Sequence, residues 1–227
     1  NTELKISNIG VVPAMWSAMS LMPNIDEVDF SRIRVAATGA ESVPAPMLEE
    51  WQQRGILLQE VYGMTETSGV VCMAQKADLP EHMGYAGRAL PYGDVKVMKS
   101  DHEEAAPGEL GEIWMRGASV TPGYWNRPDA TEEAFSGDWL KSGDIGRRDE
   151  TGRLSVEDRI KDMYISGGEN VYPAEVESIL MAHPDIREVA IIGVTDPRWG
   201  EVGCAVIATI SGEALELSAV HALCEAN

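Results

Sequence analysis

The segment Tyr62–Glu66 combines residue types that could bind a nucleotide. It follows the apolar run Ile56–Leu58, which predicts a buried strand that ends at the rim of a sheet, where open α/β sheets bind their ligands. There the Tyr62 ring could stack on a nucleobase, the Thr65 hydroxyl could donate to a phosphate, and the Glu66 carboxylate is an oxygen ligand suited to Mg²⁺. Taken alone, the segment equally fits a strand-to-loop turn with a core tyrosine and a solvated glutamate.

A second group, Ser142-Gly143-Asp144, could hold a sugar. An ionised carboxylate can accept both hydrogen bonds of a vicinal ribose diol, and Gly143 permits a tight turn and a close approach. Ser-Gly-Asp segments are also common in plain Asx turns. Arg159 lies fifteen positions after Asp144, and its fork of donors could reach a ribose hydroxyl or pair with that carboxylate.

Two further features follow Arg159 in the chain. Lys161 stands in the charged segment Asp158–Asp162, and the loop Ser166-Gly167-Gly168-Glu169 could let a thin ligand approach its backbone. The plainer interpretation is a surface lysine in a solvated turn and glycines that close a tight loop. Two other segments are interpreted as structural, namely the turn Gly108–Glu112 and the packing motif Tyr124–Asn126.

These motifs, in this order, resemble the second half of an adenylate-forming enzyme, of the acyl-CoA synthetase, luciferase and peptide-synthetase adenylation superfamily. Acyl-CoA synthetases are the closest match, because Asn170–Glu177 is of their type and lacks the basic character seen in peptide synthetases. The resemblance implies that Tyr62 stacks on adenine, that Asp144 and Arg159 bind the ribose, and that Lys161 is the interdomain hinge. It assigns nucleotide binding to Gly39, Ala40, Glu41, Tyr62, Gly63, Met64, Thr65, Asp144 and Arg159.

The resemblance also implies the reacting groups and the two substrate channels. Thr65 at the α-phosphate and Glu66, which holds the metal, are the expected catalytic residues. The expected CoA tunnel is bordered by Ser166, Gly167, Gly168 and Glu169, and the expected acyl pocket is lined by Trp16, Val61 and Val70.

The implied activity is ATP-dependent activation of a carboxylic acid to acyl-AMP, followed by thioester formation with CoA, and it requires ATP, Mg²⁺ and CoA. Val61 stands where many aryl-CoA synthetases have glycine, so a fatty or other aliphatic acid of modest size is expected. Three alternatives stay open: an adenylation domain that loads a carrier protein, a luciferase-like oxygenase, and a non-catalytic nucleotide-binding remnant. The family's phosphate loop, expected upstream of Tyr62, and its catalytic lysine, expected beyond Asn227, do not occur in the sequence. The chain is therefore expected to be cut at both ends and inactive alone.

Composition excludes some partners. The chain has 37 Asp and Glu against 18 Lys and Arg, a formal net charge of −19, which repels nucleic acid and anionic membranes. The expected partners are the small molecules that the resemblance implies: a carboxylic acid, ATP and CoA. Three cysteines without paired spacing indicate neither a zinc site nor a disulfide framework, which fits a reducing cytoplasm. Neither a signal segment nor a transmembrane stretch is recognisable, and the oligomeric state is not indicated.

The spacing of apolar residues predicts the helices and strands that must position these residues. Residues 1–84 alternate between helix and strand patterns: Pro13 can open a helix with Met15, Met19 and Met22 on its core face, Arg34–Ala37 is typical of a short strand, and Pro46 can open a second helix. This alternation predicts a mostly parallel sheet with helices on its faces.

Residues 85–160 change to short strands of period two, such as Asp94–Lys99 and Glu112–Arg116, and Arg147–Val156 is typical of a hairpin. They predict a small β-barrel or sandwich. Residues 161–227 return to an α+β pattern, with a helix that opens at Pro173. With the resemblance, the expected fold is α/β and α+β: the end of a large N-terminal domain (a parallel α/β region over 1–84 and a β-barrel-like region over 85–160), then the start of a small α+β C-terminal domain after the hinge.

Overall fold

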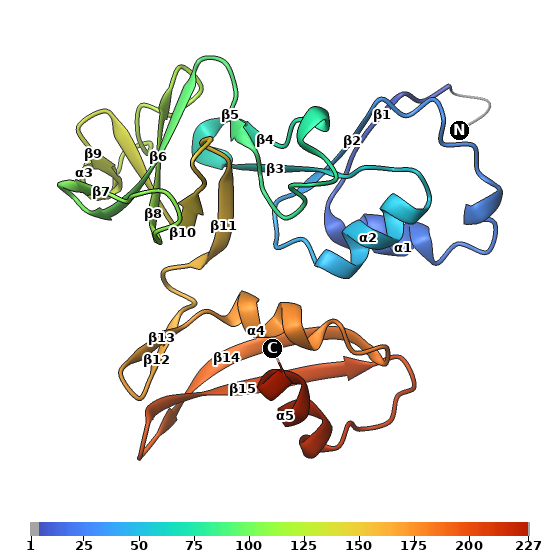
Figure 1. Cartoon of the computed structure of the whole chain (residues 1–227). Coiled ribbons are helices and arrows are strands. Elements are labelled where there is room, and N and C mark those ends of the chain that lie inside the picture. Colours follow the sequence, from blue (N-terminus) through green and yellow to red (C-terminus); the bar gives the residue numbers. More distant parts are fainter. Residues whose placement is uncertain (1–4, 227) are drawn as a thin grey trace. The chain divides into compact units, whose positions relative to one another are not determined.

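The computed structural model describes residues 5–226, and these residues divide into two compact units. The first unit ends at Val156 and the second begins at Glu157. The expected boundary, after residue 160, lies a few residues further along the chain. Each unit contains its own sheets, helices and buried core (Figure 1).

The first sheet combines parallel and antiparallel strands. Strands β1 (Asn8–Gly10), β2 (Val35–Gly39) and β3 (Gln59–Met64) run parallel, as the alternating pattern predicted. Strands β4 (Gly69–Met73) and β5 (Arg88–Ala89) continue the sheet antiparallel, which corrects the expectation of a mostly parallel sheet. The connection between β3 and β4 is too short for a crossover, so the chain must turn back beside β3.

Helices α1 (Pro13–Ser20) and α2 (Ala45–Gln53) lie together on one side of the parallel strands (Figure 1). Proline occupies the first turn of both helices, where its missing N–H has no partner to lose. The first core forms around Trp16 and Trp51, whose rings meet edge to face with centroids 4.9 Å apart. The predicted core stripe of Met15, Met19 and Met22 was wrong in part. Met15 and Met22 are each 53% exposed, and Met22 lies beyond the end of α1, whereas Met19 is partly buried and packs against this core.

The next elements confirm the expected strands over 94–99 and 112–116 and the hairpin turn at 149–152, although burial along these strands does not alternate strictly. They are β6 (Gly93–Ser100), β7 (Glu103–Glu104), β8 (Gly111–Gly117), α3 (Pro128–Ala134), β9 (Phe135–Ser136), β10 (Trp139–Arg148) and β11 (Leu154–Arg159). The last of them, β11, runs across the boundary at Val156. Their strands form a second, antiparallel sheet with the order β11-β10-β8-β6-β7 and with β9 paired to β10. The second core, which includes Ile113, Met115 and Leu140, packs on this sheet.

The second unit is α+β, as predicted. Its elements are β12 (Tyr164–Ser166), β13 (Glu169–Val171), α4 (Pro173–Leu180), β14 (Ile186–Asp196), β15 (Gly200–Thr209) and α5 (Leu217–Ala226). The sheet order is β13-β12-β15-β14, and the third core contains Tyr164, Leu180 and Ile191. The long hairpin β14–β15 is covered by α4, which also contacts α5 (Figure 1).

Three short 3₁₀ helices complete the first unit, η1 (Ile25–Glu27), η2 (Thr65–Thr67) and η3 (Lys76–Asp78). Within residues 5–226, no helix has the length and apolar character needed to cross a membrane.

Candidate functional site

Tyr62 and Asp144 meet although 82 positions separate them in the chain. The Tyr62 hydroxyl donates a hydrogen bond of 2.7 Å to Asp144 Oδ2. Burial raises the pKa of Tyr62 far above its ordinary value, and the nearby negative charge of Asp144 raises it further. The phenol therefore stays neutral and can serve as a permanent donor. Tyr62 lies near the carboxyl end of β3, the central strand of the sheet and the last of its parallel strands, at the edge where open α/β sheets bind ligands.

Asp144 is presented by an irregularity in strand β10. The pairing of β10 with β8 shifts register between Lys141 and Ile145, so residues 142–144 leave the regular ladder. Ser142 supports this segment from its side chain: its hydroxyl donates to the Ile113 carbonyl at 2.6 Å and accepts from the Asp144 N–H at 3.0 Å. Gly143 has φ +75°, which a residue with a side chain rarely adopts.

Glu66 lies on η2, directly after β3. Tyr124 Oη donates to Glu66 Oε1 at 2.8 Å, and the Thr121 N–H donates to the Glu66 carbonyl at 2.7 Å. Buried Thr67 fixes the turn, because its hydroxyl accepts from the Met64 N–H at 3.0 Å and donates to the Gly69 carbonyl at 2.6 Å. The neighbouring Thr65 side chain is exposed, so its hydroxyl can face a ligand.

Tyr124 is a site residue that the sequence interpretation missed. The segment Tyr124–Asn126 was expected to be a packing motif, but Trp125 is 90% exposed and Tyr124 contacts Glu66. The hydrogen bond, together with burial and the Glu66 charge, raises the pKa of Tyr124 above its ordinary value. Nothing in the local spacing could have indicated this contact, because 58 positions separate the two residues.

The donor set around Glu66 fits Mg²⁺ better than a metal held by protein alone. No cluster of three or more His, Cys, Asp or Glu side chains occurs among the residues that the structure describes. Mg²⁺ commonly takes one or two carboxylates and completes its shell with water and substrate phosphates. Glu66 suits this arrangement, because only one of its carboxylate oxygens accepts a hydrogen bond from the Tyr124 phenol.

The predicted adenine-pocket segment Gly39–Glu41 lies at the end of β2, next to β3. Gly39 pairs with Val61, and a Cβ on Gly39 would overlap the Val61 carbonyl oxygen and approach Val61 Cγ2 to 2.8 Å. Ala40 has φ +75°, and Glu41 Oε1 accepts the Ala14 N–H at 3.3 Å, in the first turn of α1. Gly39 at the end of β2 and Val61 on β3 thus lie side by side, next to Tyr62.

The three expected acyl-pocket residues have different surroundings. Val61 lies at the strand edge described above, and Val70 on β4 is 43% exposed. Trp16 is fully buried in the first core, and its indole N–H donates to the Ala37 carbonyl at 3.2 Å. The structure therefore gives Trp16 the contacts of a core residue, and its role at an acyl pocket stays a prediction.

The second unit carries the expected hinge and tunnel residues. Asp158 Oδ1 accepts the Arg159 N–H at 2.7 Å, and Oδ2 accepts the Ala174 N–H in the first turn of α4 at 3.0 Å. Exposed Lys161 lines a pocket of about 390 Å³ beside Asp158. The four predicted tunnel residues form the turn between β12 and β13, in which Ser166 pairs with Glu169.

Both central glycines of that turn have positive φ, +60° at Gly167 and +94° at Gly168, as a two-residue hairpin of type I′ requires. The Gly167 N–H donates to the Trp199 carbonyl at 2.8 Å, and a Cβ on Gly167 would approach the Trp199 ring to 2.7 Å. The turn is therefore held closely against Trp199.

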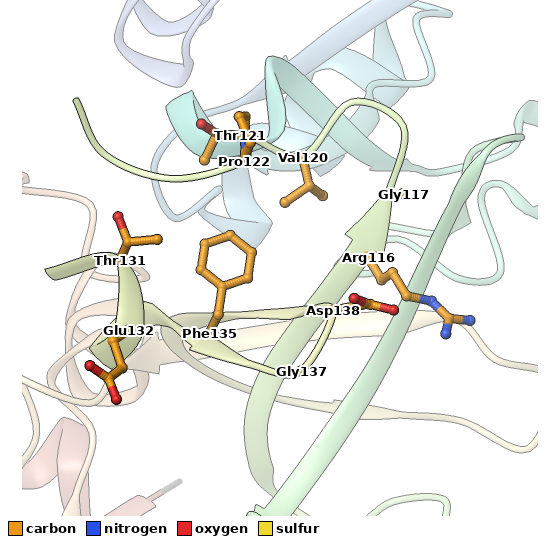
Figure 2. A pocket seen from close by; sticks show the side chains of 10 residues that line it. All are labelled: Arg116, Gly117, Val120, Thr121, Pro122, Thr131, Glu132, Phe135, Gly137 and Asp138. Atoms are coloured by element: carbon orange, nitrogen blue, oxygen red, sulfur yellow. The ribbon is translucent and has the colours of Figure 1, made fainter. Parts of the chain in front are cut away.

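Figure 2 shows a larger pocket in the first unit, of about 630 Å³, into which the Phe135 ring projects. One wall contains Val120 and Thr121, and the Thr121 N–H holds the Glu66 carbonyl. The segment after β8 thus separates this pocket from the Glu66 turn.

Two family models match the chain. The model described as AMP-binding enzyme matches residues 2–125, and the model described as AMP-binding enzyme C-terminal domain matches residues 175–225. Fold and motif order are those of adenylate-forming enzymes. The chain belongs to the AMP-binding enzyme family.

Individual relatives agree with this assignment. The chain is 40% identical to indoleacetate–CoA ligase of Aromatoleum aromaticum, over 95% of this chain and 42% of the ligase, and 40% identical to 2-succinylbenzoate–CoA ligase of Geobacillus kaustophilus, over 96% and 44%. The structure of o-succinylbenzoate CoA synthetase of Bacillus subtilis with its acyl-adenylate intermediate matches with a TM-score of 0.90 at 33% identity, over 100% of this chain and 46% of that chain. The chain thus spans less than half the length of these relatives.

Proposed function

We propose that the protein to which this chain belongs activates a carboxylic acid with ATP to form an acyl-adenylate, and then transfers the acyl group to CoA. The observation that carries the proposal is the Tyr62–Asp144 hydrogen bond at the end of β3, the strand that leads directly into the Glu66 turn. The Tyr62 ring, the Asp144 carboxylate and the Glu66 turn thus belong to one unit, where they would serve adenine, ribose and the metal ion. Relatives that are named as CoA ligases support the same activity.

In the first half-reaction, a carboxylate oxygen of the acid forms a bond to the α-phosphorus, and the bond from that phosphorus to the bridging oxygen breaks to release pyrophosphate. Tyr62 would stack on adenine, and Asp144 would accept the ribose hydroxyls. The Thr65 hydroxyl would donate to the α-phosphate. Glu66 would hold Mg²⁺, which supplies charge neutralisation for two mutually repelling anions. Positioning accounts for most of the expected rate gain.

In the second half-reaction, the CoA sulfur forms a bond to the acyl carbon and its thiol proton passes to solvent, while AMP leaves with the electron pair of the broken C–O bond. Movement of the second unit about Lys161 would bring the turn at Gly167 and Gly168 to the site. This turn would replace the contacts that the second unit makes during the first half-reaction. Arg159 would add a donor fork to the ribose hydroxyls.

For the acid, we propose a fatty or other aliphatic substrate of modest size. The branched side chain of Val61 stands beside Gly39. At the floor of the proposed acyl pocket it would take up space that a planar aryl group needs. The relatives act, by their names, on aromatic acids, on succinylbenzoate and on long-chain fatty acids, so this choice needs its own test. Efficient activation of indoleacetate in preference to hexanoate by the full-length protein would refute it.

The first experiment is a calorimetric titration of this chain with AMP, with Asp144→Ala alongside. Loss of hydrogen bonds to a charged group costs about 1.5–3 kcal/mol, so Asp144→Ala should weaken binding by about 10- to 100-fold. The matched control is Asp101→Ala, which removes an exposed turn aspartate between β6 and β7 and should leave the affinity unchanged. Equal binding by the chain and by Asp144→Ala would contradict the proposed nucleotide site.

The acyl acceptor is tested separately with the full-length protein. Formation of an acyl-CoA product on addition of CoA supports the ligase, whereas transfer only to a carrier protein, or light emission with oxygen, supports one of the alternatives. The neighbour amide bond synthetase McbA, with a TM-score of 0.90 at 29% identity, makes an amine acceptor a useful further control.

A further inference from the structure

The Glu112 carboxylate joins two N–H groups that lie on neighbouring strands. Its Oε1 accepts the backbone N–H of Gly143 at 3.0 Å, and its Oε2 accepts the indole N–H of Trp114 at 2.8 Å. Glu112 belongs to β8 and is the register partner of Ile145 on β10, at the edge of the irregular segment that carries Asp144.

The irregular segment needs support from side chains. Lys141 pairs with Trp114 and Ile145 pairs with Glu112, so the three residues 142–144 stand opposite the single residue Ile113. The regular ladder cannot supply partners for all three backbone N–H groups, and a half-buried N–H without a partner is costly. Side chains supply the missing acceptors, because Glu112 accepts from Gly143 and the Ser142 hydroxyl accepts from Asp144.

Trp114 gives the carboxylate a fixed orientation. Its ring is buried in β8, and the Lys96 ammonium lies 4.8 Å from the ring centroid. Because the indole cannot shift easily, its N–H fixes Glu112 Oε2, and the planar carboxylate then aims Oε1 at Gly143. A carboxylate suits this place because both of its oxygens are acceptors, whereas an amide offers one acceptor and one donor.

We propose that Glu112 is a positioning residue for nucleotide recognition, which holds the Gly143 turn so that the Asp144 carboxylate faces the ribose diol. This inference rests on the proposed function, in which Asp144 accepts the ribose hydroxyls. Glu112 acts through the backbone of Gly143 and does not itself contact the nucleotide.

The test compares AMP with 2′-deoxy-AMP, because only the first offers both hydroxyls to Asp144. Glu112→Gln turns one acceptor into a donor that faces an N–H, so one of the two hydrogen bonds is lost. We expect AMP affinity to fall about tenfold, the scale of one unsatisfied hydrogen bond, with a much smaller loss for 2′-deoxy-AMP. Glu133→Gln, on the exposed side of α3, is the matched control and should leave both affinities unchanged.

A second substitution isolates the geometry. Trp114→Phe removes the indole N–H, so a glutamine at position 112 can then direct its single acceptor at Gly143. Glu112→Gln should therefore weaken AMP binding less than about twofold in the Trp114→Phe background, against about tenfold in the unsubstituted chain. Purely additive effects would contradict the two-acceptor arrangement.

Exchange of the Gly143 amide proton, measured by NMR without nucleotide, gives an independent readout. We expect this amide to exchange faster in Glu112→Gln and at the original rate in Glu133→Gln. If Asp144→Ala abolishes the preference for AMP over 2′-deoxy-AMP while Glu112→Gln keeps it, the positioning role is overturned and the nucleotide site stands. If the unsubstituted chain binds no AMP, the proposed nucleotide site is not formed by this chain alone; an unchanged Gly143 exchange rate in Glu112→Gln would overturn the positioning role whether or not AMP binds.

Discussion

Glu60 is a carboxylic acid held where its charge is costly. It lies on β3, two residues before Tyr62, and its Oε1 accepts the Gly84 N–H at 2.7 Å. Burial raises the pKa of Glu60 from 4.5 to about 7, against the opposing effect of that hydrogen bond. Glu60→Gln keeps the acceptor for Gly84 and removes the titrating group, so it isolates the energetic effect of the charge.

The direction of the effect follows from proton binding. Between pH 4.5 and about 7, the folded state keeps a proton on Glu60 that the unfolded state has lost, so the free energy of unfolding falls as the pH rises. At about 1.4 kcal/mol per pH unit, the full loss is at most about 3 kcal/mol, and partial exposure of the side chain reduces it. Glu60→Gln should therefore match the unsubstituted chain at pH 4.5 and be more stable by about 1–3 kcal/mol at pH 8.

The assay is urea unfolding of both proteins at pH values from 4.5 to 8, followed by tryptophan fluorescence. Glu49→Gln on the exposed face of α2 is the control and should show a smaller change with pH. A stability difference between Glu60→Gln and the unsubstituted chain that stays constant across the range would refute the reasoning. A gain in the stability of Glu60→Gln at low pH that disappears at high pH would also refute it, because the pH dependence would then have the opposite sign.

Three substitutions test the packing around the site. Gly63→Ala would place a Cβ onto the Gly69 carbonyl oxygen, so we expect loss of AMP binding together with a lower melting temperature of the first unit. Trp51→Ala should lower the free energy of unfolding of that unit by about 3–5 kcal/mol in urea titrations, because it empties the first core. Gly167→Ala forces a side chain against the Trp199 ring at positive φ, and should destabilise the second unit by about 1–2 kcal/mol in thermal unfolding while AMP binding to the first unit is retained. An unchanged stability of any of these variants would contradict the packing described for it.

Local signals in the sequence were sufficient for most elements. Helices that open at Pro13 and Pro173 were predicted because proline at the first helical position loses no hydrogen bond. The turn at 149–152 was predicted from its Asp-Glu-Thr-Gly sequence, and the structure places it between β10 and β11. The family's motif order assigned Tyr62 and Asp144 to the same nucleotide, but their direct hydrogen bond was not predicted, because no local pattern requires it.

The features that were missed depend on contacts between distant residues. The bond from Tyr124 to Glu66 and the bond from Gly143 to Glu112 join segments about 30 to 60 positions apart, and periodicity carries no information at that range. The exposed side of α1 was assigned wrongly for a related reason: Met15 is as apolar as a core residue, and only the position of the sheet decides that Trp16 faces it.

The separate cores decide what a melting curve of this chain can measure. The third core draws its buried members from residues after Glu157, and the first two draw theirs from residues before Val156. We expect each unit to have a cooperative transition with its own enthalpy, so that no single melting temperature describes the chain. AMP bound at Tyr62 and Asp144 would shift the calorimetric peak of the first unit by mass action, and a shift of the second peak in the same scan would report the ribose contact proposed for Arg159, which lies in the second unit.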